Sequence, residues 1–399
     1  MLLKNKVFFY IPLLFFIPSS IYIGQYKIGP LISGSILLYY LIYILKTKNK
    51  QIKVSLFSTI YALKNIVNMS TLTYLNTLLY ISIQYSFLGI ILQAFTNKKS
   101  LVSLQFILKS FYIFLSLNVI INLFVFLGLI PQFGQGYDLS RFGLSNQNGF
   151  TGVYDNYTAS IIFAFNAVCL YQYLFEQKFS KTITTLLIFC SILFTYKTYF
   201  RTGYACLAIG SIAFILLTKS ISRYTKVKIL IVFSIIFLSS VIYLYNKDKV
   251  FQYRISDENI YNENETNTNK SIGSGRFDFF LAGIDILKES NTLEILLGYG
   301  LPITTKKMEE KVGMKIFMHN ELMNSLIQNG LIGLLIFVCL NIFFLKKIFK
   351  MKRSKYYSFT MSCYIMFIIY FLFQGGPFPI IYMFISYTLL IQTKDFLSI

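Results

Sequence analysis

The chain has 399 residues, of which 55% are hydrophobic and only 13% are charged, with a mean hydropathy of +0.61. Soluble domains carry about 25% charged residues, so these values exclude an ordinary soluble fold and predict one membrane domain. A net charge of +21 would suit nucleic-acid binding. The basic residues nevertheless sit in short clusters between apolar runs, which is the pattern of membrane topology, and we expect no nucleic-acid partner.

The five cysteines each lie inside an apolar run, and no CxxC pair occurs. This arrangement argues against a disulfide framework or a thiolate metal site. The sequence also has no carboxylate and histidine cluster with metal-ligand spacing, no Walker loop and no GxGxxG unit. We therefore expect neither a metal, nor a cofactor, nor direct use of nucleotide energy.

Apolar runs near the length that a membrane-spanning helix needs, about 20 residues, recur along the whole chain. We predict an all-α, polytopic transmembrane bundle with about twelve spans, at 7–24, 28–45, 52–69, 71–95, 103–130, 157–174, 182–200, 202–218, 228–246, 321–345, 356–374 and 376–392. The first run follows Lys4 and Lys6 as in a signal peptide, but it has no convincing cleavage site and is interpreted as an uncleaved span. The segment 52–69 carries Lys64 and polar residues, so a surface helix is its alternative.

The distribution of Lys and Arg predicts the orientation of the spans. If the N-terminus is cytoplasmic, the cytoplasmic segments hold 21 of these residues, whereas the short outer loops hold only Lys27, Arg141 and Arg201. Both termini are then predicted to be cytoplasmic in a multi-pass protein of the bacterial plasma (inner) membrane. This layout gives transmembrane helices in 1–246, a large outer loop in 247–320, and the remaining spans in 321–399.

The large outer loop 247–320 combines a polar linker with short amphipathic structure. A helix is predicted to begin at Arg276, with Ser274 as its N-cap and Asp278 in its first turn. Its apolar face comprises Phe277, Phe280, Leu281, Ile284 and Leu287. Such a helix would lie on the membrane surface or on the spans. The segment LLGYG at 296–300 is predicted to be a turn.

The single histidine, His319, lies where this loop re-enters the membrane. Asn320 is expected to cap the following helix and Glu321 suits its first turn. A helix N-terminus disfavours the imidazolium form, so His319 would stay neutral and able to accept a proton, although Glu321 opposes that effect. The alternative is an interfacial histidine without a chemical role.

Three arginines are candidates for anion binding on the outer face. Arg276 opens the loop helix, where backbone N–H groups and a guanidinium fork suit phosphate. Arg201 lies between two spans in YFRTGY, with Thr202 as a possible helix cap, and Arg141 is a weaker case in the segment 131–156. The alternative for each is an interfacial or snorkelling arginine. If the helix N-termini converge with His319, they form a diphosphate site beside one base.

The sequence resembles the superfamily of O-antigen polymerases and ligases (Wzy-type polymerases and WaaL-type ligases). The resemblance covers nearly the whole chain: many spans, a large loop before the last few, and the motifs YFRTGY, SGRFDFFLAG and HNELMNSLIQNGLIGLLIF. The last motif is the most specific, since the family often has HN followed by an apolar helix with a Gly-Leu-Ile-Gly-like turn.

The resemblance implies a GT-C-like glycosyltransferase that uses a glycan on undecaprenyl diphosphate without metal or nucleotide. Arginines matching Arg201 and Arg276 would hold the diphosphate, and a histidine matching His319 would activate the acceptor hydroxyl. Loop aromatics would stack on sugar rings; the candidates are Tyr154, Tyr157 and Tyr299. We expect membrane lipid and a chain-length regulator protein as further partners, and Asn320 and Arg141 as further substrate-binding residues.

Three functions remain open at this point. The first is a polymerase of O-antigen or capsule repeat units, and the second is a ligase that moves the glycan onto lipid A core or another acceptor. The third is a flippase or transporter of lipid-linked oligosaccharides, which would also have about twelve spans. The 74-residue segment 247–320 argues against the third, because flippases usually have short loops.

Overall fold

The computed structural model describes residues 22–23, 26–27, 103–133, 149–154, 156–175, 179–248, 250–252, 276–313, 318–374 and 379–398. Two short strands, β1 (Tyr22–Ile23) and β2 (Tyr26–Lys27), form an antiparallel pair. The rest of the first four predicted spans lies outside these residues, as do Arg141 and the predicted N-cap Ser274.

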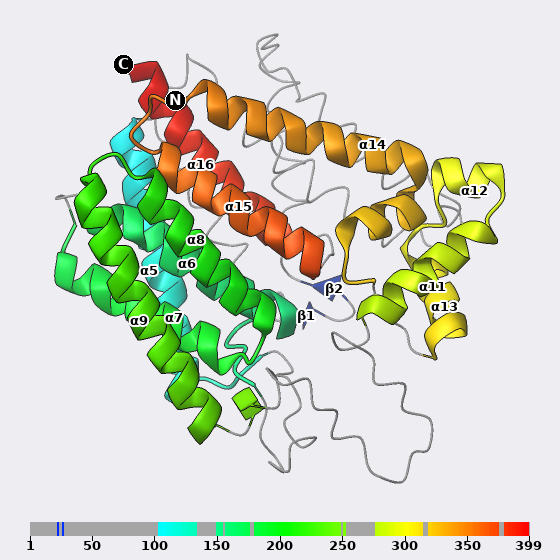
Figure 1. The fold of residues 1–399 in the computed structure, drawn as a ribbon, viewed down its shortest axis with the longest axis horizontal. Helices are drawn as coiled ribbons and strands as arrows, with labels where there is room; N and C mark the ends of the chain where they lie inside the picture. The colour runs from blue at the N-terminus through cyan, green and yellow to red at the C-terminus, as the bar shows by residue number, and fades with distance from the viewer. Residues whose placement is uncertain are drawn as a thin grey trace. The chain divides into compact units, whose positions relative to one another are not determined.

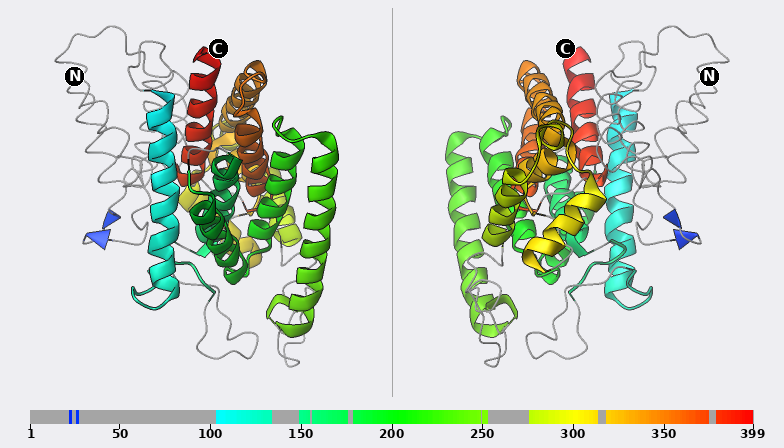
Figure 2. Two further views of the ribbon diagram at one scale, coloured as in Figure 1. Left: turned by 90° about the vertical axis from the view of Figure 1, so that its left-hand side faces the viewer. Right: turned by 90° about the vertical axis from the view of Figure 1, so that its right-hand side faces the viewer.

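Helices dominate the described part of the chain, which confirms the all-α class. Each of the eight later predicted spans coincides with a helix: α5 (Leu104–Phe126), α6 (Asn156–Phe175), α7 (Lys181–Lys197), α8 (Arg201–Leu217), α9 (Arg223–Lys247), α14 (Glu321–Lys350), α15 (Tyr357–Phe373) and α16 (Pro379–Ser398). Three more helices lie in the predicted loop: α11 (Arg276–Lys288), α12 (Thr292–Leu297) and α13 (Leu301–Val312). Figures 1 and 2 draw these helices, with their labels in Figure 1.

The described helices have the lengths and compositions of a membrane protein. Stretches long and apolar enough to cross a membrane occur in α5, α6, α9 and α14, and α8 and α15 are shorter apolar helices. α9 has no buried residue, although it is one of the strongly apolar helices. Apolar surface exposed over a whole helix is stable against lipid rather than water. The protein is therefore an integral membrane protein, while the number of twelve spans stays a prediction.

The chain divides into two compact units, each assembled from separate segments. In the unit that comprises 112–277 and 355–370, α6 packs against both α7 and α8. Its core is aromatic, with the rings of Phe150, Phe163 and Phe194 between 5.2 and 5.8 Å apart. Such clusters add directional contacts to apolar burial, and here they join α6 and α7.

The second unit contains 278–354 and 371–399 together with 1–111. A buried cluster joins loop residues to the start of α14 and comprises Phe279, Ala282, Ile286, Tyr299, Met308, Met318 and Ile327. On the predicted apolar face of α11, Phe277, Phe280 and Leu281 are exposed, and the placement of this face on the membrane surface stays a prediction. Gly283 lies close to α14, since a Cβ there would lie 2.8 Å from Met318 Sδ and 3.1 Å from Met323 Cε.

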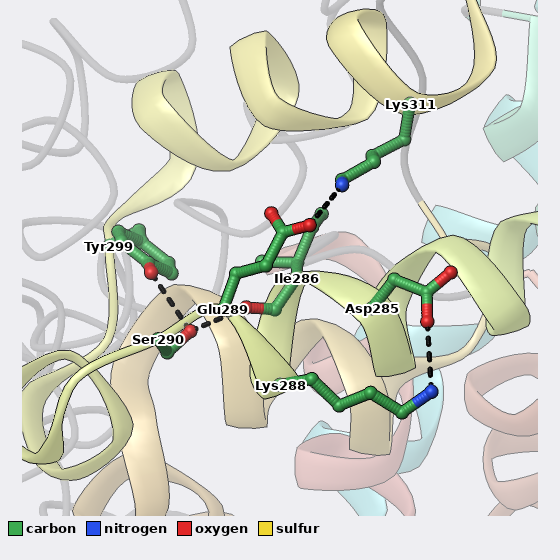
Figure 3. Close-up of polar contacts among 7 residues, drawn as sticks. All are labelled: Asp285, Ile286, Lys288, Glu289, Ser290, Tyr299 and Lys311. Carbon is green, nitrogen blue, oxygen red and sulfur yellow. Dashed lines mark hydrogen bonds and ion pairs between the residues drawn. The ribbon is translucent and has the colours of Figure 1, made fainter.

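Polar contacts tie the three loop helices together (Figure 3). Glu289, just after α11, binds Lys311 of α13, and this hydrogen bond raises the pKa of Lys311. Asn291 and Glu294 form a capping box that starts α12, a local signal of a helix N-terminus. The turn predicted at 296–300 is confirmed only for 298–300, because Leu296 and Leu297 belong to α12 and α13 begins after Gly300.

Candidate functional site

His319 and Asn320 form the start of α14. Asn320 is the N-cap, and its side-chain oxygen accepts a hydrogen bond from the Met323 N–H at 3.1 Å, as predicted. His319 has a φ of +49°, in the left-handed region, where histidine is less disfavoured than most side chains. Backbone strain of this kind costs on the order of 1 kcal/mol and clusters at functional sites.

The imidazole of His319 makes a hydrogen bond and a ring contact with other segments. Its Nδ1 lies 3.3 Å from the carbonyl oxygen of Gln374, and its ring centre lies 5.7 Å from that of Phe279 in α11. A carbonyl can only accept, so Nδ1 carries the proton in this contact. In a neutral imidazole Nε2 then holds the lone pair and is the nitrogen able to accept a proton.

Further polar contacts fix the residues around His319. The Asn320 amide donates to the Leu372 carbonyl oxygen at 3.4 Å, and the Met318 N–H donates to Asn324 Oδ1 at 3.3 Å. Glu321 is buried and accepts a hydrogen bond from Ser325. The first turn of α14 therefore already contains a carboxylate and a side-chain cap, so it suits an added anionic ligand less well than an uncapped helix start does.

Arg201 is the first residue of α8, as the sequence predicted. The predicted cap Thr202 was wrong: the N-cap is Phe200, which has no side-chain hydrogen bond to the helix, and Thr202 is a buried helix residue. No acidic residue lies in the first turn. The α8 N-terminus thus combines backbone N–H groups without a side-chain cap and a guanidinium group, which together suit an anion.

A second left-handed residue precedes this helix start. Tyr199 has a φ of +58°, which is a rare conformation for a bulky side chain. The hydroxyls of Tyr196 and Tyr199 both donate to Asp248 Oδ2, the latter at 3.4 Å. The Tyr204 hydroxyl donates to the Tyr196 carbonyl oxygen at 2.7 Å. These contacts join the end of α7, the start of α8 and the end of α9 around Arg201.

Arg276 is the first residue of α11 and lies one turn before Phe279. Residues three apart share a helix face, so Arg276 and Phe279 lie on the side of α11 that carries the contact to His319. Arg201 and Arg276 both fall within the unit that comprises 112–277, whereas His319 belongs to the second unit, and Arg141 lies outside the described residues. The convergence of the three arginines with His319 stays a prediction.

The loop tyrosines differ from the sequence-based expectation. Tyr154 is 1% exposed and accepts a hydrogen bond from Asn118, so it is not available to stack on a sugar. Tyr299 is 3% exposed, and its ring lies under Lys307 Nζ at 4.5 Å. Sugar stacking on Tyr299 would require the ring to leave this packing. The side chain of Tyr157 lies outside the described part of the structure.

Sequence reasoning missed the residues that orient His319, namely Phe279, Asn324, Leu372 and Gln374. Leu372 and Gln374 lie at the end of α15, 53 or more positions from His319, and no local pattern links them. The only available signal was the polar QGG sequence that interrupts two apolar runs. Within the described residues no group of three or more His, Cys, Asp or Glu side chains is arranged to bind a metal.

Residues 186–338 match the family model described as O-antigen ligase. The match begins in α7 and ends in α14, so it contains Arg201, Arg276, Tyr299, His319 and Asn320. No curated protein matches the chain significantly. This segment of the chain is therefore similar to the O-antigen ligase family, in agreement with the resemblance seen in its sequence motifs.

Proposed function

We propose that the protein polymerises glycan repeat units of an O-antigen or capsule. It would transfer the growing chain from undecaprenyl diphosphate onto an incoming lipid-linked repeat unit. The observation that carries the proposal is the setting of the single histidine, whose Nδ1 faces the Gln374 carbonyl, so that the lone pair of the neutral ring is on Nε2. The family match supports the class of reaction.

In this reaction His319 Nε2 takes the proton of the acceptor sugar hydroxyl. The hydroxyl oxygen forms a bond to the anomeric carbon of the donor, and the bond from that carbon to the diphosphate oxygen breaks. The electron pair leaves with the lipid diphosphate. A general base contributes about 10²- to 10⁴-fold to such a step. Asn320 caps the helix and holds the turn that presents His319.

The leaving diphosphate gains negative charge, and we assign its stabilisation to arginine and helix N-termini. Arg201 at the start of α8 and Arg276 at the start of α11 are the proposed donors, with Arg141 as a further candidate. Donors aimed at developing charge are often the largest single contribution to catalysis. Tyr299 supports the loop that carries Arg276 rather than the sugar itself.

The proposed site lies on the outer side of the plasma membrane, with both chain termini in the cytoplasm. This orientation follows from the concentration of Lys and Arg in the other loops. The donor and acceptor are then both membrane-anchored lipids, and the reaction uses the energy of the diphosphate linkage. We propose that it needs neither a metal nor a nucleotide. A chain-length regulator protein is a further proposed partner.

A ligase is the second candidate function, because the matching family model is described as O-antigen ligase. The chemistry at His319 would be the same, since a ligase also moves the glycan from the lipid diphosphate to a hydroxyl acceptor. Only the acceptor differs between the two candidates.

A deletion strain separates the candidates. Loss of a polymerase leaves single repeat units attached to the final acceptor, whereas loss of a ligase accumulates long chains on the carrier lipid. The direct assay incubates the purified protein with lipid-linked repeat units extracted from that strain. A ladder of chain lengths is expected from the wild type but not from His319→Ala. As a control, the same repeat units should be extended by an extract of the parent strain. If the purified wild type does not extend units that pass this control, the polymerase proposal is refuted. If His319→Ala and Arg276→Ala both left the chain length unchanged while export of the lipid-linked glycan failed, a transporter would be favoured.

A further inference from the structure

The helix α14 is broken at Gly330, nine residues after its first residue (Figure 1). Gly330 has a φ of +65° and a ψ of −173°, a combination that is essentially restricted to glycine. A break in a helix leaves carbonyl groups before it without their intrahelical partners. Inside a membrane protein such groups must find other donors, because an unpaired one costs several kcal/mol.

The turn Gly298–Gly300 supplies these donors, and we name it the latch. The Tyr299 N–H donates to the Ile327 carbonyl oxygen at 2.8 Å, and the Gly300 N–H donates to that of Gln328 at 2.7 Å. Both acceptors lie in the last turn before the break. The two hydrogen bonds therefore replace helical ones and join the loop between α12 and α13 to the first part of α14.

Two glycines make this approach possible. A Cβ on Gly298 would lie 2.3 Å from the Gly330 nitrogen, and a Cβ on Gly330 would lie 2.2 Å from the Leu296 carbonyl oxygen. Both contacts are with backbone atoms, so no side-chain rotation relieves them. Gly298 and Gly300 also have φ values of +75° and +77° with extended ψ, which again only glycine adopts readily.

The latch is anchored through the side chain of Tyr299. The hydroxyl lies 2.8 Å from both Ser290 Oγ and Glu294 Oε2 (Figure 3 shows the Ser290 contact), and Lys307 of α13 lies over the ring. These partners follow α11, begin α12 and lie in α13. One residue thus links the three loop helices to the broken helix.

The latch bears on His319 because the first part of α14 is short and held at both ends. At its start, Asn320 and His319 contact the carbonyl oxygens of Leu372 and Gln374. At its end, Ile327 and Gln328 are held by the latch. A straight membrane span needs neither the break nor a loop inserted against it.

We propose that Gly298 and Gly330 are positioning residues, and that the latch sets the orientation of His319 against α11. This proposal rests on the proposed function of His319 as the base. Displacement of a reacting group by about 1 Å can reduce the rate about 100-fold. A bulkier residue at either glycine should separate the latch from α14, release the first part of the helix and lower kcat with little change in KM.

The single histidine permits a readout that is independent of activity. Diethyl pyrocarbonate modifies neutral imidazole, and its adduct at His319 is followed by peptide mass spectrometry in the purified full chain. We expect Gly298→Ala and Gly330→Ala to accelerate modification severalfold, because His319 loses its fixed contacts. Gly313→Ala is the matched control: Gly313 also has a φ of +75°, but a Cβ there meets nothing within 4 Å. It should modify at the wild-type rate.

Hydrogen exchange of the wild-type protein tests the latch without any variant, so a folding defect cannot obscure the result. The Tyr299 and Gly300 amides should exchange as slowly as those of the first part of α14. Free exchange of these amides would overturn the proposal, and so would equal modification rates in Gly298→Ala, Gly313→Ala and wild type.

Activity measured with the lipid-linked repeat units then separates this proposal from the proposed function. A wild type that fails to extend chains contradicts the polymerase proposal, whatever the modification rates. An active wild type whose kcat is unchanged in both Gly298→Ala and Gly330→Ala contradicts only the latch.

Discussion

The N-termini of α8 and α14 have similar backbone turns but different caps and charges. Each follows a non-glycine residue with a positive φ, Tyr199 in one case and His319 in the other. The α14 start has the side-chain cap of Asn320 and a buried carboxylate, whereas the α8 start has neither and begins with Arg201. Similar backbone turns thus precede two helix starts with different caps, to which we assign different proposed roles: anion binding at α8 and proton transfer at α14.

The largest expected effect tests the α14 side of this comparison. His319→Ala should lower the rate of chain growth about 10²- to 10⁴-fold, because a general base is removed from the reacting hydroxyl. The rate is measured with lipid-linked repeat units and purified protein. Binding of the lipid donor should be retained. Residual activity within a factor of a few of wild type would mean that His319 is not the base.

The next effect tests the α8 side. Arg201→Ala should raise the KM for the lipid donor about 10- to 100-fold, since a hydrogen bond to a charged group contributes about 1.5–3 kcal/mol. Arg201→Lys should recover only part of the loss, because lysine keeps the charge but lacks the planar fork of donors. A KM equal to wild type in Arg201→Ala would remove this helix start from the diphosphate site.

Stability distinguishes the two helix starts in a third way. Asn320→Ala should lower the free energy of unfolding by about 1 kcal/mol through loss of the cap, and Asn320→Ser should restore most of it. The change is measured by denaturant titration in detergent. α8 has no equivalent side-chain cap to remove. If Asn320→Ala has full stability, the bond to the Met323 N–H contributes nothing to the turn.

The smallest effect concerns the tyrosines beside Arg201. Tyr199→Phe should change the free energy of unfolding by less than about 1 kcal/mol, since its contact with Asp248 is long. Tyr196→Phe should cost more, because its hydroxyl makes the closer contact with the same carboxylate. Equal costs for both variants would show that Asp248 does not discriminate between the two hydroxyls.

The positions of the helices, and the residues at several helix N-termini, were largely predictable from the sequence. Asn320 is a strong local signal because its oxygen can only reach backbone groups three residues away, and the structure confirms it as the cap. Arg201 and Arg276 each begin the helix that local patterns assigned to them. Apolar runs likewise predicted each described helix from α5 onward outside the loop.

Prediction from the sequence missed the features that depend on tertiary contacts. The helix α11 has apolar residues on two sides, so periodicity did not reveal that Gly283 lies against Met323 and Ile327 of α14. A residue without a side chain allows this close approach, and no helical periodicity marks it. The break at Gly330 was missed for the same reason, because a glycine inside an apolar run is tolerated in a straight helix.

The division of roles between the two helix starts is tested most directly by equilibrium binding of the lipid diphosphate donor. The measurement compares His319→Ala and Arg201→Ala with the wild type in one lipid environment. His319→Ala should bind the donor as tightly as the wild type, and Arg201→Ala should bind it about 10-fold or more weakly. Equal loss of donor binding in both variants, or no loss in either, would contradict the assignment of anion binding to α8 and proton transfer to α14.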